Sequence, residues 1–281
     1  MIQCLNALIF CKYIIIALSH SLIKAFLIFA VALIILMKKL VISMLSIFLL
    51  ISCSNQATSD NTKEEANNTS EQQKIVTPPA ASDKDLTFKF KNDEPGKMPP
   101  GWSQYFTGKG DATDWKVVED EGNRVLAQLS EDNPNYHFNV IVYDGFVAKN
   151  VSLNVRLKGV KGKMDQGGGF VWRFIDADNY YVVRANPLED NVVLYKVENG
   201  KRTDLPVLDK GRTYGVEVEP LGNDWNILKL TVLDNIFTVY LNSKLIFQVR
   251  DETFVNAGKV GLWTKADAVT YFDDLHLTIY H

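Results

Sequence analysis

Hydrophobic and polar positions divide the chain into three segments of different character. Residues 1–52 are almost continuously apolar, residues 54–84 are almost entirely polar, and residues 85–281 alternate between the two kinds. Alternation over short runs is typical of half-buried β-strands, and only this last segment has the apolar positions needed to bury a core. Its length of roughly 200 residues predicts one large β-domain rather than two domains.

The alternating segment predicts many short strands separated by turn residues. The runs are 86–90, 115–118, 124–129, 138–143, 151–157, 170–175, 180–185, 192–197, 214–218, 228–233, 237–241, 244–249, 260–264 and 268–279. Turn sequences at 198–201, 234–235 and 242–243 lie between such runs, as tight hairpins require. No long amphipathic helix is evident. The pattern predicts an all-β fold, a two-sheet antiparallel jelly-roll sandwich.

Two stretches carry a resemblance to a known family. Residues 168–188, which read GGFVWRFIDADNYYVVRANPL, and residues 258–265 with 271–275 resemble the concanavalin A-like (laminin-G-like) jelly rolls of bacterial exported proteins. Within that group they are most similar to the DUF1080 or 3-keto-disaccharide hydrolase domains. The resemblance covers residues 85–281 and implies a jelly roll that handles or binds glycans. It does not establish catalysis, because sandwiches of this kind host lectins, hydrolases and inert modules.

The chain contains a complete export signal that begins at Met37. Two lysines follow Met37, then an apolar run, and then Leu50-Ile51-Ser52-Cys53, which is similar to the bacterial lipobox. Residues 37–52 are therefore interpreted as a lipoprotein signal peptide and Cys53 as the lipidated residue, the alternative being a membrane-spanning helix. We hypothesise that residues 1–36 are a spurious extension and that translation starts at Met37. Detection of residues 1–36 by mass spectrometry of the cell-derived protein would contradict this.

The segment that follows Cys53 predicts an anchor and a tether. Residues 53–84 have too few apolar side chains to fold alone, so we expect a disordered tether to a lipid bilayer. The expected location is the bacterial cell envelope, with the outer membrane favoured because Ser54 follows the lipidated cysteine. The other cysteines, Cys4 and Cys11, precede the domain, which therefore has no disulfide. A net charge of -3 with interspersed signs offers no basic surface for nucleic acid.

Paired carboxylates that could hydrolyse a glycosidic bond are not evident. Glu217 and Glu219 share a strand face, but the valines that alternate with them indicate the solvated side of an ordinary strand. Asp273 and Asp274 are adjacent and are expected to point to opposite faces. No catalytic residue is predicted. A glycosidase of the 3-keto-disaccharide type, implied by the resemblance, would need a metal or an acid pair assembled from separate strands.

Metal sites are weakly indicated. The run Asp176-Ala177-Asp178-Asn179 could supply oxygen ligands to calcium, or its side chains could cap a hairpin turn. His137 and His276 have no cysteine partner in the domain, so no zinc site is predicted. No cofactor is assigned, and calcium is left open.

Aromatic and planar polar side chains suitable for a sugar site occur on three strands. The candidate carbohydrate-binding residues are Trp172, Tyr180, Arg184, Asn186, Trp263 and Lys265. They would form a shallow groove if the Trp172, Arg184 and Trp263 faces coincide on one concave sheet; the alternative is that both tryptophans fill the core. Arg184, in an apolar strand, must lie on an open face or be paired. The sequence thus predicts a lipid-anchored carbohydrate-binding protein, with a glycosidase and a structural or protein-binding module as alternatives.

Overall fold

Alternating side chains give the strands two unlike faces. In β6 (Asn150–Lys161) Val151, Leu153, Val155 and Leu157 are buried, and the residues between them are partly exposed. Such a strand covers a core with one face and meets solvent with the other. The computed structural model describes residues 84–280, and every helix or strand assigned there is a β-strand. None of these residues belongs to a helix that could span a membrane.

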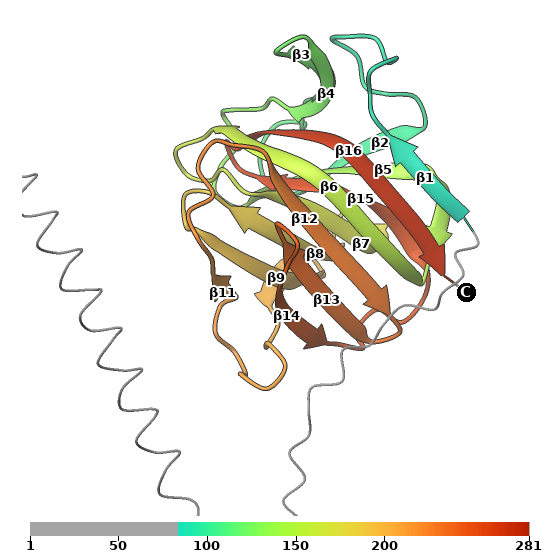
Figure 1. Ribbon diagram of the computed structural model, residues 1–281, viewed down its shortest axis with the longest axis vertical. Coiled ribbons are helices and arrows are strands. Elements are labelled where there is room, and N and C mark those ends of the chain that lie inside the picture. The colour runs from blue at the N-terminus through green and yellow to red at the C-terminus, as the bar shows by residue number, and fades with distance from the viewer. Residues whose placement is uncertain (1–83, 281) are drawn as a thin grey trace, which may run out of the picture. The chain divides into compact units, whose positions relative to one another are not determined.

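The strands form two antiparallel sheets that face each other (Figure 1). Sheet A has the order β14-β13-β12-β6-β16-β4-β3, with β1 paired to β16, and sheet B has the order β10-β9-β8-β7-β15-β5-β2, with β11 paired to β9. In sheet A the bounds are β1 Lys84–Phe88, β3 Trp115–Asp120, β4 Asn123–Gln128, β6 Asn150–Lys161, β12 Asn226–Leu233, β13 Ile236–Leu241, β14 Lys244–Arg250 and β16 Val269–Tyr280. In sheet B they are β2 Trp102–Gly108, β5 His137–Ala148, β7 Gly168–Asp176, β8 Asn179–Asn186, β9 Asn191–Glu198, β10 Lys201–Asp204, β11 Val216–Glu217 and β15 Gly258–Lys265. The predicted two-sheet antiparallel jelly-roll sandwich is confirmed.

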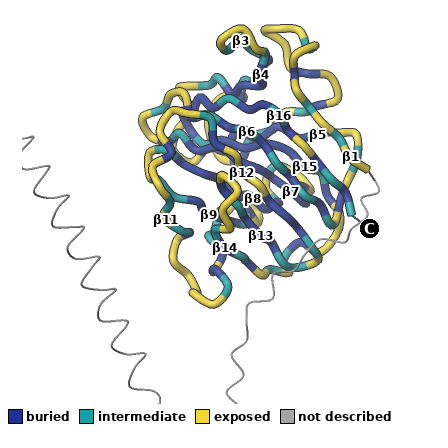
Figure 2. Tube along the Cα trace, in the orientation of Figure 1, coloured by how far each residue is buried: buried dark blue, intermediate teal, exposed yellow. Residues whose placement is uncertain are grey.

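Apolar side chains gather in two layers rather than one. The main core lies between the sheets and draws residues from both. A second group, called here the outer cluster, comes from sheet B alone and alternates along its strands with residues of the main core, so it lies on the outer face of that sheet. Its members are Phe138, Val140, Val142, Val171, Phe174, Tyr180, Val182, Val193, Tyr195, Val197 and Trp263, all buried. Sheet B is thus buried on both faces over much of its area (Figure 2).

Three hairpins form where the turn sequences predict them. Glu198 pairs with Lys201 around Asn199-Gly200, whose φ angles are 52° and 73°. Leu241 pairs with Lys244 around Asn242-Ser243, also with two positive φ angles. Two positive φ angles are what a type I′ turn requires, and its twist matches that of the flanking strands. The third turn joins Leu233 to Ile236 through Asp234-Asn235.

Some elements differ from those predicted. The sequence does not predict β2 and β10, because the aromatic residues of WSQYFTG do not alternate regularly with polar ones and KRTD has no apolar residue. Both pair with only one strand, at the two ends of sheet B. The strand expected over 214–218 is reduced to β11, since Tyr214 and Gly215 have positive φ angles of 54° and 79° that interrupt an extended backbone.

A β-bulge in β7 changes which way its side chains point. Arg173 has a φ of 47°, and the pairing register with β8 shifts between Trp172 and Asp176. As a result Phe170 and Trp172 face the main core, whereas Phe174 belongs to the outer cluster. Strict alternation would place Phe170, Trp172 and Phe174 on one face, and the bulge breaks this because it adds a residue to the alternation.

Gly169 lets β7 approach β8 closely. A Cβ atom there would lie 1.9 Å from the carbonyl oxygen of Val183 and 2.8 Å from the Cα of Arg184. We expect Gly169→Ala to lower the free energy of unfolding by about 3 kcal/mol, because two central strands must separate. Chemical denaturation of the full chain measures this. Gly211→Ala, where only the positive φ of 77° is violated and no atom lies within 4 Å, should cost about 1 kcal/mol; equal losses in the two variants would contradict the steric explanation.

Candidate functional site

The predicted site residues do not all lie on one face. Trp172 is fully buried between the sheets, where its ring lies 5.4 Å from that of Tyr181 and 5.2 Å from that of Phe237. Trp263 belongs to the outer cluster, on the opposite side of sheet B. The predicted coincidence of Trp172 with Arg184 and Trp263 is wrong, and both tryptophans are core residues, which was the alternative.

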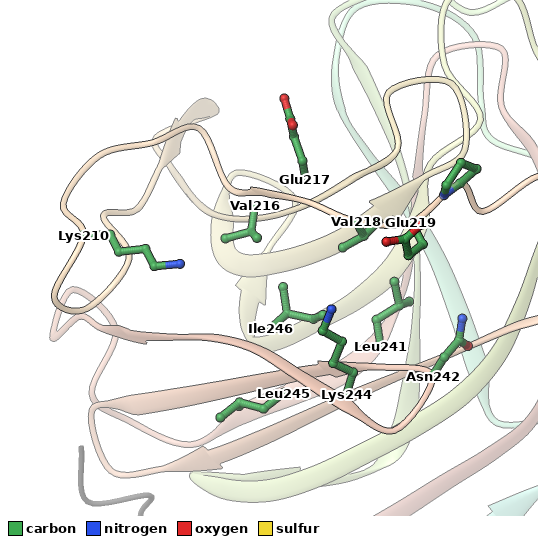
Figure 3. A pocket seen from close by; sticks show the side chains of 11 residues that line it. Lys210, Val216, Glu217, Val218, Glu219, Leu241, Asn242, Lys244, Leu245 and Ile246 are labelled. Carbon is green, nitrogen blue, oxygen red and sulfur yellow. The ribbon is translucent and has the colours of Figure 1, made fainter. Parts of the chain in front are cut away.

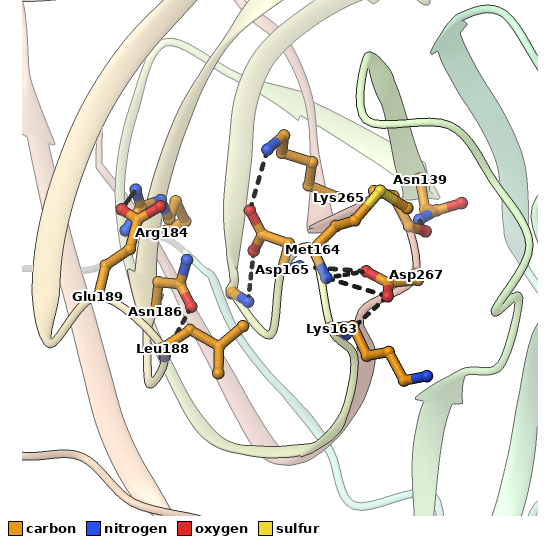
Figure 4. A network of polar contacts seen from close by, with 12 residues as sticks. Asn139, Lys163, Met164, Asp165, Arg184, Asn186, Leu188, Glu189, Lys265 and Asp267 are labelled. Carbon is orange, nitrogen blue, oxygen red and sulfur yellow. Dashed lines mark hydrogen bonds and ion pairs between the residues drawn. The ribbon is translucent and has the colours of Figure 1, made fainter.

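The remaining predicted residues share the outer face of sheet B. Tyr180, Arg184 and Asn186 alternate along β8, and Trp263 and Lys265 alternate along β15. Tyr180 is buried at one end, where its hydroxyl lies 2.7 Å from that of Thr107. Arg184, Asn186 and Lys265 are at the other end, in a network of polar contacts (Figure 4). The structure therefore separates an apolar part of this face from a charged one.

Arg184 is buried, with 2% of its surface exposed, and is fully partnered. Its guanidinium donates to the Glu189 carboxylate at 2.6 Å, to the side-chain oxygen of Asn191 and to the Tyr195 hydroxyl at 3.2 Å. Lys265 pairs with Asp165 at 3.2 Å. We call Asp165, Arg184, Glu189, Tyr195 and Lys265 the Arg184 cluster. Of the two environments that the sequence allowed for Arg184, the structure shows the paired one.

The charges of this cluster stabilise one another. Burial would raise the pKa of Glu189, but Arg184, Asn191 and Lys265 outweigh it, so the pKa of Glu189 is lowered. Burial would likewise lower the pKa of Arg184, yet Tyr195, Glu189 and Asp165 raise it overall. Both groups therefore stay charged at neutral pH, because each stabilises the charged form of the other.

Asp267 builds the loop that carries Asp165. Its carboxylate accepts hydrogen bonds from the backbone N–H groups of Lys163 at 2.6 Å, and of Met164 and Asp165 at 3.1 Å each. Burial would raise the pKa of Asp267, but these three donors outweigh it and lower the pKa. Asp165 then accepts from the backbone N–H of Gly167 at 2.7 Å. The Asp267 carboxylate, which the sequence did not indicate, thus fixes the loop against the Arg184 cluster.

Arg202 was also missed, and it lies on the aromatic part of the face. Its guanidinium carbon is 4.4 Å from the ring centroid of Tyr195, 4.8 Å from that of Phe138 and 5.9 Å from that of Trp263. Register could have indicated it, since the Asn199-Gly200 turn pairs Arg202 with Val197 of the outer cluster. The three aromatic rings hold the guanidinium cation through its flat face, and such contacts do not use its N–H groups.

Two donors on this face lack a partner among the described residues. They are Nη1 of Arg202 and Nδ2 of Asn186, and both are buried, whereas the Trp263 indole lies within reach of the Tyr180 hydroxyl. Five further buried polar atoms in residues 84–280 are also unpartnered, but they are scattered over other strands and loops. Buried donors without partners are uncommon, and each calls for a water, ion or ligand.

Two exposed tyrosines flank Arg202. Tyr136 is 47% exposed, and its hydroxyl donates to the carbonyl of Gly200 at 3.1 Å and accepts from the Arg202 backbone N–H at 2.7 Å. Tyr214 is 49% exposed, with its hydroxyl 3.2 Å from that of Tyr195. Both rings are therefore held by hydrogen bonds at the margin of the outer cluster, where they offer apolar faces to solvent.

The acidic candidates are arranged differently from the prediction. Asp273 and Asp274 were expected to point apart, yet both reach Nη1 of Arg156, at 3.6 and 3.4 Å. The reason is a bulge, since Asp274 has a φ of 47° and the register shifts between Asp273 and His276. Burial raises the pKa of Asp273, and the charge of Asp274 adds to the rise. Asp273 also accepts from Nδ2 of Asn123 and from the backbone N–H of Asp274, so its oxygens serve the bulge.

The run at residues 176–179 caps a hairpin. Oδ1 of Asp176 accepts from the Asp178 backbone N–H at 2.8 Å and from Nδ2 of Asn179 at 2.9 Å. Across residues 84–280 no group of three or more His, Cys, Asp or Glu side chains is placed to hold a metal ion. Cys53, the signal peptide and the tether lie outside the described residues.

Fold and site together define a jelly-roll sandwich with an aromatic and charged site on one outer face. No family profile matches the chain, so its resemblance to the DUF1080 domains stays a prediction, and no curated protein matches it. Among solved structures it is similar to a carbohydrate-binding module, CBM66, from Bacillus subtilis, with 19% identity and a TM-score of 0.48 over 63% of this chain and 95% of that one. A putative glycosyl hydrolase from Parabacteroides distasonis has 18% identity and a TM-score of 0.43 over 69% and 94%. Domain 4 of AbnA, an arabinanase from Geobacillus stearothermophilus solved with arabinotriose, has 13% identity and a TM-score of 0.42 over 69% and 90%. At these identities and TM-scores the neighbours say nothing about what this chain binds.

Proposed function

We propose that the domain binds a carbohydrate at the outer face of sheet B, around Arg184 and Arg202. The observation that carries the proposal is the pair of buried donors without a partner, Nη1 of Arg202 and Nδ2 of Asn186, beside exposed aromatic rings. Sugar hydroxyls are acceptors as well as donors, so one ligand could satisfy such donors and also bond to a carboxylate. Glu189 is partly exposed and remains ionised, which makes it an acceptor for ligand hydroxyls.

The aromatic margin fits the same ligand. Pyranose and furanose rings have apolar faces that pack on aromatic rings, and Tyr136 and Tyr214 present such rings to solvent. The ion pairs of Arg184 with Glu189 and of Lys265 with Asp165 are each neutral, so the Arg184 cluster itself does not need a charged ligand. A ligand would first contact the exposed rings of this margin, and it would reach the buried donors only after side chains there move aside.

The test is titration of the full chain with a panel of oligosaccharides that includes arabinotriose. We expect Arg202→Ala to weaken binding of a responsive saccharide at least tenfold, since a hydrogen bond from a charged donor contributes about 1.5–3 kcal/mol. Arg250→Ala, an exposed arginine at the edge of sheet A, is the matched control and should bind as the wild type does. Thermal melting shows whether each variant is folded, and Arg202→Lys keeps the charge if alanine does not fold. Absence of binding to every saccharide, or equal affinity in Arg202→Ala and Arg250→Ala, would sink the proposal.

We further propose that the domain binds sugar without cleaving it. A general acid must be protonated at working pH, which requires a raised pKa, whereas the pKa of Glu189 is lowered. A screen on 3-keto-disaccharides measures this directly. Hydrolysis by the wild type that disappears in Glu189→Gln would favour the glycosidase instead.

Membrane anchoring through Cys53 is also proposed, on the lipobox-like tetrad and the polar segment that follows it. It would place the domain at the surface of a bacterial membrane, with the outer membrane favoured. We expect Cys53→Ser to move the chain from the membrane fraction to the soluble fraction and to abolish labelling by radioactive palmitate. Unchanged fractionation and labelling would contradict the proposal.

A further inference from the structure

A cavity lies between the two sheets at one edge of the sandwich, where its β11 wall pairs with Asn191 and Val192 of β9, next to the Arg184 cluster. Residues 216–220 form one wall and the β13–β14 hairpin forms the other (Figure 3). Its volume is about 470 Å³, within the range of about 300–1,000 Å³ that is usual for small-molecule sites. A second hollow of about 220 Å³ shares Lys210, Leu245 and Ile246 with it and extends along β14 to Gln248.

The cavity has an apolar floor that is not fully covered. Val216, Val218 and Ile246 are partly buried against the main core, and Leu245 is 37% exposed. Figure 3 shows the two valine side chains directed toward Ile246 and Leu241 across the cavity. Together these side chains give the hollow an apolar surface on which a hydrocarbon chain could pack.

Two lysine ammonium groups face this floor. In Figure 3 the side chains of Lys210 and Lys244 reach over the cavity, whereas the carboxylate of Glu217 points away from it. The ion pairs found among residues 84–280 involve neither lysine. Glu219, at the rim beside Pro220, is the one carboxylate left near the opening. Apart from Glu217, which is turned outward, the lining therefore has two cations and one anion.

We propose that this cavity binds an apolar carboxylate, of which a medium-chain fatty acid is the simplest example. The hydrocarbon would lie on Val216, Val218 and Ile246, and the carboxylate would lie between Lys210 and Lys244. Complementary charge over an apolar floor favours this ligand over an uncharged chain, whose end would leave both ammonium groups without a partner. The proposal does not rest on saccharide binding, since no residue that lines the cavity belongs to the proposed saccharide site.

Calorimetric titration of the full chain with dodecanoate, below its micelle concentration, tests the proposal. Binding should strengthen from octanoate to dodecanoate by up to about fourfold per methylene, as expected for chain burial. Dodecanol should bind about four- to 25-fold more weakly than dodecanoate, which is about two- to fivefold for each of the two exposed ammonium groups. The double substitution Lys210→Ala and Lys244→Ala should remove this difference, with melting temperature and saccharide affinity as checks on folding.

Glu219→Gln supplies a test of opposite sign. Removing this anion should tighten dodecanoate binding two- to fivefold and leave dodecanol unchanged, as expected for one exposed charge. Val218→Trp should fill the cavity and abolish binding of both. The proposal is overturned if dodecanoate does not bind, if it binds no more tightly than dodecanol, or if the lysine substitutions change neither affinity.

Discussion

Arg173→Met is expected to lower the free energy of unfolding by about 4 kcal/mol, the largest effect of any single substitution considered. The Arg173 side chain is 1% exposed, and its guanidinium donates to three backbone carbonyls. They are those of Lys149 at 3.1 Å, Phe254 at 2.7 Å and Asp234. Methionine fills similar space but leaves these oxygens without donors, each at a cost of about 1–3 kcal/mol, partly recovered by water.

The matched comparison is Arg212→Met. Arg212 is 54% exposed and pairs with Asp204 at the surface, so its loss should cost less than about 1 kcal/mol. Arg173→Lys should lie between wild type and Arg173→Met, because an ammonium group cannot reach three carbonyls in one plane. Chemical denaturation of the full chain gives all three values. A loss below 1 kcal/mol for Arg173→Met would show that the three loops do not depend on this side chain.

Arg184→Met is expected to cost about 3 kcal/mol at pH 7. Removing one partner of a buried pair leaves the other charge uncompensated, at about 3–5 kcal/mol, and the partial exposure of Glu189 favours the lower value. Adding Glu189→Gln to this variant should recover part of the loss, which a double-mutant cycle measures. Strictly additive losses would contradict the coupling of the two residues.

The same pair predicts a dependence on pH. In the folded wild type the pKa of Glu189 is lowered from its ordinary 4.5, so its contribution to stability is present above that value and is lost as pH falls through the folded pKa. The difference between wild type and Arg184→Met should therefore be constant from pH 7 to about 5 and shrink in more acidic solution. Denaturation at pH 7 and pH 3.5 measures this. A difference that grows as the pH falls would show that the sign is wrong.

Strand positions and hairpins follow from sequence because they depend on local chemistry. Alternation marks the buried face of β6, and Asn199-Gly200 fixes a turn whatever surrounds it. Bulges at Arg173 and Asp274 do not follow, since each depends on contacts with distant strands and loops. One extra residue at Arg173 is enough to turn Phe174 to the face opposite Trp172. A prediction that assumes strict alternation therefore fails from this residue onward.

Site residues divide along the same line. Arg184 could be selected from sequence because a guanidinium in an apolar strand must have a partner, and the structure supplies Glu189 from the next turn. Arg202 could not be selected by polarity, because Lys201-Arg202-Thr203-Asp204 is polar throughout and only its register with β9 reveals the face. The role of Asp267 depends on the distant loop whose N–H groups it accepts, and no feature of the neighbouring sequence indicates it.

The pairing of β1 with β16 determines where the chain of the domain could be cut and rejoined. Lys84 lies directly opposite Ile279, so the described chain enters and leaves the sandwich at one corner. Ends this close suit circular permutation: a short linker could join them, and new termini could be opened in an exposed turn such as Asn242-Ser243. In such a permuted domain the chain would begin and end at a different corner, while both outer faces keep the same residues.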